Sequence, residues 1–258
     1  MSLRFRETVR RSLLLSIGRV RLKLIGCEVL YRELCHVVAR SRNQVDVEFL
    51  PKGLHDLGGE GMRVRLQEVV DRVDSSRYEA VLFGYGLCGN GIAGLAARSL
   101  PLVLPRAHDC ITLFLGSRER YLDYFNTHPG TYFKTSGWIE RASGLVDLER
   151  QITLGYDELV AKYGEENAKY LHEELTKHYR QFTFIETGIE PDDRFERHTR
   201  EEAGRRGWSF EKVQGDLGLF QRLVDGPWDD GDFLVAPPGA RVVVSHNDGI
   251  IRAEKADQ

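Results

Sequence analysis

The chain has 258 residues, enough for one large α/β domain or two smaller ones with a sizeable core. Hydrophobic residues make up 41% of it and charged residues 29%, a balance that excludes wholesale disorder. The 36 Lys and Arg residues nearly balance the 39 Asp and Glu residues, so the net charge of -3 lacks the positive excess of a dedicated nucleic-acid-binding protein. No apolar run approaches the roughly 20 residues that span a bilayer. We therefore expect a cytoplasmic protein that binds neither nucleic acid nor membranes.

Strands and helices alternate through the first half of the chain. Buried-strand patterns and helical spacing of apolar residues predict, in chain order, strand 20–25, helix 28–40, strand 45–50, helix 62–73, strand 80–83 and strand 102–104. Such alternation with short connections is typical of a parallel sheet with helices on its faces. The sequence therefore predicts a Rossmann-like, three-layer parallel α/β lobe over residues 19–118.

The second half of the chain is more helical and adds further strands. We expect helices over 118–126, 148–163 and 165–180, followed by strands at 182–186, 210–213, 233–236 and 241–244. These strands would either complete the first sheet or form a smaller second one. The predicted organisation is an N-terminal extension (1–18), the Rossmann-like lobe, a helical bridge (119–180) and a C-terminal α/β segment (181–252).

Metal-binding side chains fall where the predicted strands end. Cys27 follows the first strand, His55 the second, Cys88 the third, and His108 and Cys110 the fourth. Ligands of open α/β sheets bind outside the carboxyl ends of the strands, so these loops should converge. Thiolate and imidazole suit zinc, and thiolates also hold iron–sulfur clusters. The sequence predicts a metal site of Cys27, Cys88, His108 and Cys110, with zinc and iron–sulfur both open and core packing of each cysteine as the alternative.

A glycine-rich segment follows the third predicted strand. Gly84, Gly86 and Gly89 match the spacing GxGxxG, and a helix is expected to begin after them. Together with Asn90, this loop is a candidate to bind a cofactor or a small anionic ligand through its backbone amides. A dinucleotide is the weaker interpretation, because the loop follows the third strand instead of the first. The glycines could instead serve a tight turn that presents Cys88.

Three charged residues near the cysteines are candidates for catalysis. Arg106 would bind a carboxylate or phosphate group of the substrate, or else form an ordinary ion pair with a neighbouring acid. Asp109 would orient His108 as a hydrogen-bond acceptor, or else cap a helix that begins at Cys110. Glu28 would act as a general base, or else only favour the N-terminus of a helix. A helix N-terminus near Cys27 or Cys88 would lower the pKa of the thiol.

Several short motifs occur together in this chain. They include Gly26-Cys-Glu-Val-Leu30, Gly84-Tyr-Gly-Leu-Cys-Gly-Asn-Gly91, Pro105-Arg-Ala-His-Asp-Cys-Ile-Thr-Leu113, Pro129-Gly-Thr-Tyr132 and Gly226-Pro-Trp228. With them the chain resembles the bacterial and archaeal family called domain of unknown function 1638. The resemblance implies a link to corrinoid and one-carbon methyl-transfer systems, and hence corrinoid or methyltransferase proteins as partners. His108-Asp-Cys110 is similar to the His-x-Cys pair that holds zinc in zinc-dependent thiol methyltransferases.

Three functions are therefore compatible with the sequence. The leading hypothesis is a metal-dependent enzyme, with zinc or an iron–sulfur cluster, that acts on a small anionic substrate in thiol or one-carbon methyl-transfer metabolism. The first alternative is a non-catalytic accessory protein that binds a cofactor or a partner in a corrinoid methyl-transfer system. The second is a metal-free cysteine enzyme in which His108 activates Cys88 or Cys110.

Overall fold

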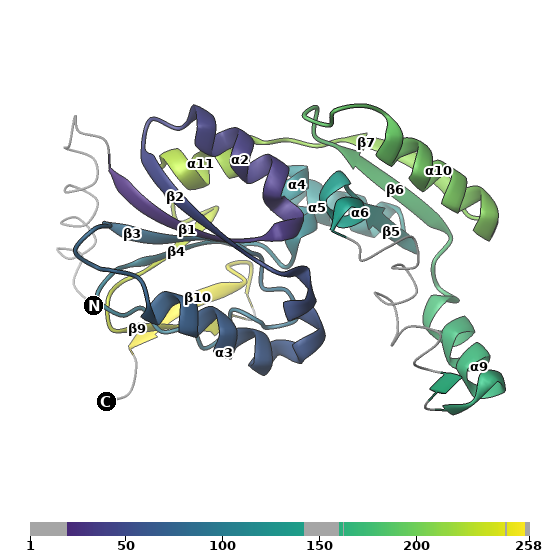
Figure 1. Cartoon of the computed structure of the whole chain (residues 1–258), viewed down its shortest axis with the longest axis horizontal. Coiled ribbons are helices and arrows are strands. Elements are labelled where there is room, and N and C mark those ends of the chain that lie inside the picture. Colours follow the sequence, from purple (N-terminus) through teal and green to yellow (C-terminus); the bar gives the residue numbers. More distant parts are fainter. Residues whose placement is uncertain (1–19, 142–159, 162, 246, 256–258) are drawn as a thin grey trace. The chain divides into compact units, whose positions relative to one another are not determined.

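The chain forms two compact units in a computed structural model that describes residues 20–141, 160–161, 163–245 and 247–255 (Figure 1). Unit 1 contains the chain up to Tyr121 and again from Asp216, and unit 2 contains Leu122–Gly215. The predicted extension 1–18 and most of the predicted helix 148–163 lie outside the described residues. The boundary between the units falls within helix α5 (Arg118–Thr127).

Unit 1 is built on a mostly parallel sheet, sheet A, with the strand order β2-β1-β3-β4-β8. The first four strands of this order are parallel to one another, and β8 pairs antiparallel with β4. Every residue of β3 and of β4 is buried, as expected for central strands with both faces covered. The strands are β1 (Arg21–Cys27), β2 (Gln44–Leu50), β3 (Ala80–Gly84), β4 (Leu102–Pro105) and β8 (Phe233–Ala236). The predicted Rossmann-like α/β fold is confirmed.

Helices cover both faces of sheet A. Figure 1 shows α2 and α11 on one side of the sheet and α3 on the other. The Ser41 hydroxyl, which follows α2, donates to the carboxylate of Asp225 at the end of α11 over 2.7 Å and ties these two helices together. The helical elements of unit 1 are η1 (Glu28–Leu30), α2 (Tyr31–Arg40), η2 (Lys52–Leu57), α3 (Gly58–Asp71), α4 (Cys110–Leu115) and α11 (Gly218–Asp225).

The C-terminal part of the chain returns to unit 1 and adds an antiparallel hairpin. Strands β9 (Ala240–Val244) and β10 (Ile251–Lys255) pair from Val244 with Ile251 to Ala240 with Lys255. The predicted strands 233–236 and 241–244 are both present. One of them, β8, completes the first sheet.

Unit 2 has its own parallel sheet, sheet C, with the strand order β5-β6-β7. Helix α10 packs on β6 and β7, and the core beneath it contains Phe182 and Ala203. The elements of unit 2 are β5 (Thr131–Lys134), α6 (Ser136–Glu140), α9 (Glu165–Thr176), β6 (Gln181–Glu186), α10 (Arg194–Arg206) and β7 (Ser209–Gln214). Strand β5 lies inside the segment 119–180 that was expected to be a helical bridge.

Among the helices that the structure describes, none is both long enough and apolar enough to cross a membrane.

Candidate functional site

The strand order of sheet A reverses between β1 and β3. From β1 the chain moves to β2 on one side and then to β3 on the other, so the carboxyl ends of β1 and β3 form a topological switch point. Their register pairs Gly26 with Gly84. Cys27 is the last residue of β1, and Tyr85 is the first residue after β3. Open α/β sheets bind ligands in the crevice outside such a point. We refer to Cys27, His55, Tyr85 and Cys88 as the switch-point cluster.

Two glycines bring helix α2 close to this edge of the sheet. A Cβ atom at Gly26 or Gly84 would lie 2.6 or 2.8 Å from Cδ1 of Leu34, closer than such atoms approach in proteins. Leu34 is fully buried in α2. Glycine at both positions therefore lets α2 pack directly over the ends of β1 and β3.

Cys27 and His55 are in direct contact. The Cys27 Sγ lies 3.9 Å from Nε2 of His55, and the Cys27 side chain is only 2% exposed. His55 is carried by η2, which is held in place where the Lys52 amide donates to the Glu28 carboxylate over 2.7 Å. Burial raises the pKa of Cys27 to about 11 and lowers the pKa of His55, so both groups are neutral at pH 7. The expectation that a helix N-terminus would favour the Cys27 thiolate is wrong, because η1 is a single 3-10 turn and burial dominates.

Cys88 is half-buried and sits on a strained turn. Its φ is +47°, a left-handed conformation that side chains other than glycine rarely adopt, and Gly89 and Asn90 follow at +63° and +70°. The amide N–H groups of Gly86 and Cys110 are directed at its sulfur and lower the pKa of the thiol. These two amides are outweighed. Burial, the negative charge of Asp109 and the charge that Cys27 would carry as a thiolate together raise the pKa of Cys88 to about 12.

Main-chain hydrogen bonds join the turn at Cys88 to the loop after β4. The Leu87 amide donates to the Ala107 carbonyl over 2.8 Å, and the Cys88 amide donates to the His108 carbonyl over 2.9 Å. This close approach requires glycine at position 86, where a Cβ atom would lie 2.7 Å from the main chain of Asp109.

The glycine spacing has a structural reason other than cofactor binding. Gly84 makes room for Leu34, Gly86 makes room for Asp109, and Gly89 adopts a left-handed conformation next to Asn90. Residues 85–101, all of which the structure describes, form turns and a single bridge but no helix. The prediction that this loop opens a helix is wrong, so the helix N-terminus that would bind a pyrophosphate is missing.

Tyr85 belongs to the cluster but was not predicted from the sequence. Tyr85 is 1% exposed, and its hydroxyl is buried next to the Cys27 side chain, with which it interacts. Burial, together with prospective charges on Cys27 and Cys88, raises the pKa of Tyr85. A tyrosine directly after a fully buried strand at the switch point was the signal that could have identified it.

The structure does not gather the four predicted metal ligands. Within the described residues, no three His, Cys, Asp or Glu side chains are close enough together to hold a metal ion. His108 is exposed, with its ring 6.4 Å from that of Tyr121, and Cys110 is buried as the first residue of α4. Asp109 caps α4 by accepting from the Ile111 amide over 3.0 Å, as the alternative interpretation of this residue predicted. It also accepts from the Tyr121 hydroxyl over 3.1 Å.

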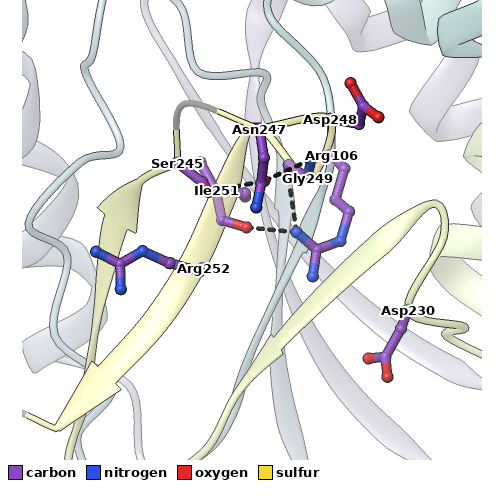
Figure 2. A pocket seen from close by; sticks show the side chains of 8 residues that line it. All are labelled: Arg106, Asp230, Ser245, Asn247, Asp248, Gly249, Ile251 and Arg252. Carbon is purple, nitrogen blue, oxygen red and sulfur yellow. Dashed lines mark hydrogen bonds between the residues drawn. The ribbon is translucent and has the colours of Figure 1, made fainter.

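Arg106 faces the β9–β10 loop. Its Nε donates to the Phe233 carbonyl over 3.2 Å, and its Nη1 donates to the carbonyls of Gly249 and Ile251 (Figure 2). These two carbonyls flank Ile250, which has a φ of +61°. The guanidinium therefore clamps a strained loop, a role that the sequence did not suggest. It also lines a pocket of about 410 Å³ with Asp230, Ser245, Asn247, Asp248, Gly249, Ile251 and Arg252.

One family model matches this chain. It is described as "Protein of unknown function (DUF1638)", and it matches residues 49–224, more than half of the chain. No curated protein and no solved structure is significantly similar to the chain. The matched range includes His55, Tyr85 and Cys88, and Cys27 precedes it. The chain therefore belongs to the DUF1638 family, the family of unknown function that its motifs resemble.

Proposed function

We propose that this protein is a metal-dependent enzyme that binds zinc at the switch point, with Cys27 and His55 as two of its ligands. Because no third such side chain lies close enough to them in the described residues, Cys88 would have to move toward the pair to complete the site. The observation that carries the proposal is the distance of 3.9 Å between Cys27 Sγ and His55 Nε2. Two such ligands of one tetrahedral zinc ion lie about 3.6 Å apart, given metal–ligand distances of about 2.3 and 2.0 Å. The pair therefore needs only a small adjustment to hold the ion. His55 takes the place that the sequence prediction assigned to His108.

The electrostatics of the cluster favour a cation there over a metal-free nucleophile. As thiolates, Cys27 and Cys88 would each raise the pKa of Tyr85. A Cys27 thiolate would also raise the pKa of Cys88. A catalytic thiolate in a metal-free enzyme is instead found where cationic neighbours lower its pKa. Lys52 lowers the pKa of Cys27 but does not offset burial. A bound metal ion would supply the further positive charge that deprotonating the thiols requires.

The ligand set determines what chemistry such a site would support. Three protein ligands leave one position of a tetrahedral ion open, which distinguishes catalytic from structural zinc sites. Zinc in such a site acts as a Lewis acid on a carbonyl or phosphoryl oxygen, or activates a bound thiol or water. The charge of Lys52 acts on both Cys27 and His55, so this residue would attract an anionic substrate in place of Arg106.

The test is metal analysis of protein purified without oxygen, beside four variants. We expect about one zinc per chain, lost in Cys27→Ala and His55→Ala. The matched controls Cys35→Ala and His108→Ala remove the same side-chain types outside the cluster and should keep the metal. If the protein instead contains several irons and absorbs broadly in the visible range, the bound group is an iron–sulfur cluster and not zinc. Folded wild-type protein that binds neither metal would refute the proposal.

Cys88 favours a second candidate function, a metal-free thiol enzyme. The observation is its left-handed backbone at the end of a central strand, with two amide N–H groups directed at the sulfur. Strained residues of this kind cluster at active sites. This function predicts rapid alkylation of Cys88 by iodoacetamide at pH 7 in the presence of a chelator. The zinc proposal predicts slow alkylation there, because the chelated protein keeps Cys88 as a neutral thiol.

A further inference from the structure

The pocket around Arg106 is a second place where unit 1 can bind a small molecule (Figure 2). Arg106 directly follows β4, so the pocket opens at the carboxyl end of a central strand of sheet A, where ligands of open α/β sheets bind. Its volume of about 410 Å³ is within the usual range of small-molecule sites. Its lining includes no residue of the switch-point cluster, so it is a site to be considered separately.

Main-chain carbonyls fix the positive charge of Arg106 at the wall of this pocket. The Nε atom donates to the Phe233 carbonyl over 3.2 Å, and Nη1 donates to the carbonyl of Gly249 over 2.6 Å and to that of Ile251. A carbonyl carries no net charge, so these three acceptors orient the guanidinium without neutralising it. A cation that is already held in place loses little conformational freedom when an anion binds to it.

Asn247 brings an oriented hydrogen-bond donor to the same pocket. Its Oδ1 atom accepts from the Ser245 hydroxyl over 2.8 Å and from the Gly249 amide over 2.9 Å. Because a main-chain N–H can only donate, these bonds assign the oxygen and leave Nδ2 as the donor of the side chain. Nδ2 donates to no residue that the structure describes. It is therefore available to a ligand in the pocket.

Gly249 keeps the space between these two side chains open. A Cβ atom at this position would lie 3.0 Å from Oδ1 of Asn247 and 3.2 Å from Nη1 of Arg106, closer than most such atoms approach. The φ angle of Gly249 is outside the positive range that favours glycine, so the backbone conformation alone does not require one. What glycine provides here is room between the cation and the amide.

The acids of the pocket determine which ligand suits it. Arg106 and Arg252 line it together with Asp230 and Asp248, and Arg252 forms an ion pair with Glu254. The segment that carries Asp230 is tied to Arg106, whose amide donates to the Asp232 carbonyl over 2.8 Å. A ligand with only a negative charge would be attracted by Arg106 and repelled by the acids. A ligand that carries both a carboxylate and an ammonium group would match both kinds of charge.

We propose that this pocket binds a small zwitterion of the α-amino acid type. Its carboxylate would lie against Arg106 and accept from Nδ2 of Asn247, and its ammonium group would lie against Asp230. A primary ammonium fits better than a quaternary one, because none of the eight lining residues is aromatic and quaternary ammonium groups are bound by aromatic side chains. The inference uses no proposed zinc ligand and is independent of the zinc proposal.

The test is a titration of the ¹⁵N-labelled full chain with three probes, followed by amide NMR shifts. L-Alanine carries both charges, propionate only the carboxylate and ethylammonium only the ammonium group. We expect L-alanine to shift the signals of residues 247–252 and to bind about 2- to 5-fold more tightly than propionate, the contribution of one ion pair at a solvent-open site. Ethylammonium should bind at least about 10-fold more weakly than L-alanine, because it lacks the group that Arg106 and Asn247 recognise.

The variant Asp230→Asn tests where the ammonium group binds. It removes one charge at nearly constant size, and it should abolish the preference for L-alanine over propionate. Asp192→Asn is the matched control, because it removes an exposed carboxylate from unit 2, where Asp192 pairs with Arg194 over 2.6 Å, and it should keep the preference.

Three results would overturn the inference. The first is a wild-type chain whose signals shift with none of the probes. The second is a set of shifts that is largest outside the pocket. The third is a preference for L-alanine that is absent in the wild type or persists in Asp230→Asn, since the ammonium group would then not be recognised by Asp230.

Discussion

At the scale of single residues, the ion pair between Lys134 and Glu202 in unit 2 makes the sharpest stability prediction. Their charged atoms are 3.3 Å apart and their side chains are 7% and 11% exposed. Replacing Glu202 by Ala would leave the Lys134 ammonium buried without its carboxylate, so we expect a loss of about 3–5 kcal/mol in the free energy of unfolding. Urea denaturation would measure it. Lys212→Ala is the control, because its partners Glu186 and Glu196 hold it at an exposed site where a pair contributes at most about 1 kcal/mol.

Gly86 gives a second prediction at this scale. A methyl group there would lie 2.7 Å from the main chain of Asp109, so Gly86→Ala must push apart the loops that follow β3 and β4. We expect a loss of about 1–3 kcal/mol in stability, as for other overpacked sites. Gly204→Ala is the matched control. It lies within α10, where an added Cβ atom would meet no described atom within 4 Å outside the adjoining backbone of the helix, and alanine there should stabilise the helix by about 1 kcal/mol. Equal effects of the two substitutions would contradict this account.

At the scale of elements, periodicity identified some elements and missed others for physical reasons. The helix from Tyr31 to Arg40 and the strands of sheet A carry strong apolar patterns, and the sequence predicted them. Helix α10 was not predicted, because two of its four buried residues, Thr199 and Glu202, are polar and its apolar stripe is therefore weak. The turns after β3 were mistaken for the start of a helix, since glycine spacing alone does not distinguish a phosphate-binding loop from close main-chain packing.

The β9–β10 hairpin provides the prediction at the scale of elements. Arg106 bridges the carbonyls on both sides of Ile250 and also reaches Phe233 in β8, so it holds the strained loop against the sheet. Arg106→Lys cannot make all of these contacts, because an ammonium lacks the planar fork of a guanidinium. We expect faster amide hydrogen exchange in β10 and unchanged metal binding at the switch point. Arg252→Ala, which removes an exposed cation from the same hairpin, should leave the exchange unchanged.

At the scale of the whole molecule, the location of the candidate site was predictable but its composition was not. Alternating strands and helices, with the rule that ligands bind at the carboxyl ends of strands, predicted a candidate site near Cys27 and Cys88. Both His55 and His108 follow strands, so the sequence could not decide which one faces the cysteines. That choice depends on how two loops fold: the Glu28 carboxylate holds the amide of Lys52 and so carries His55 inward, whereas His108 is exposed in the turn before α4.

The division into two units gives a final prediction about how metal binding affects stability. Cys27, His55 and Cys88 all belong to unit 1, so zinc at about 100 times its Kd should stabilise unit 1 by about 2.7 kcal/mol and leave unit 2 unchanged. Each unit has a core of its own and should unfold as its own cooperative transition. The three tryptophans can report the two transitions separately, since Trp228 lies in unit 1 and Trp138 and Trp208 lie in unit 2.

The measurement is urea unfolding followed by tryptophan fluorescence in two variants. Trp228→Phe leaves only the two reporters of unit 2, and its midpoint should not change when zinc is added. A chain with both Trp138→Phe and Trp208→Phe reports unit 1 alone, and its midpoint should rise with zinc concentration. If both variants respond equally, the units unfold as one cooperative body, and the metal cannot be assigned to unit 1 by this route. If only unit 2 responds, the metal site lies outside the switch-point cluster, and the proposed ligands are wrong.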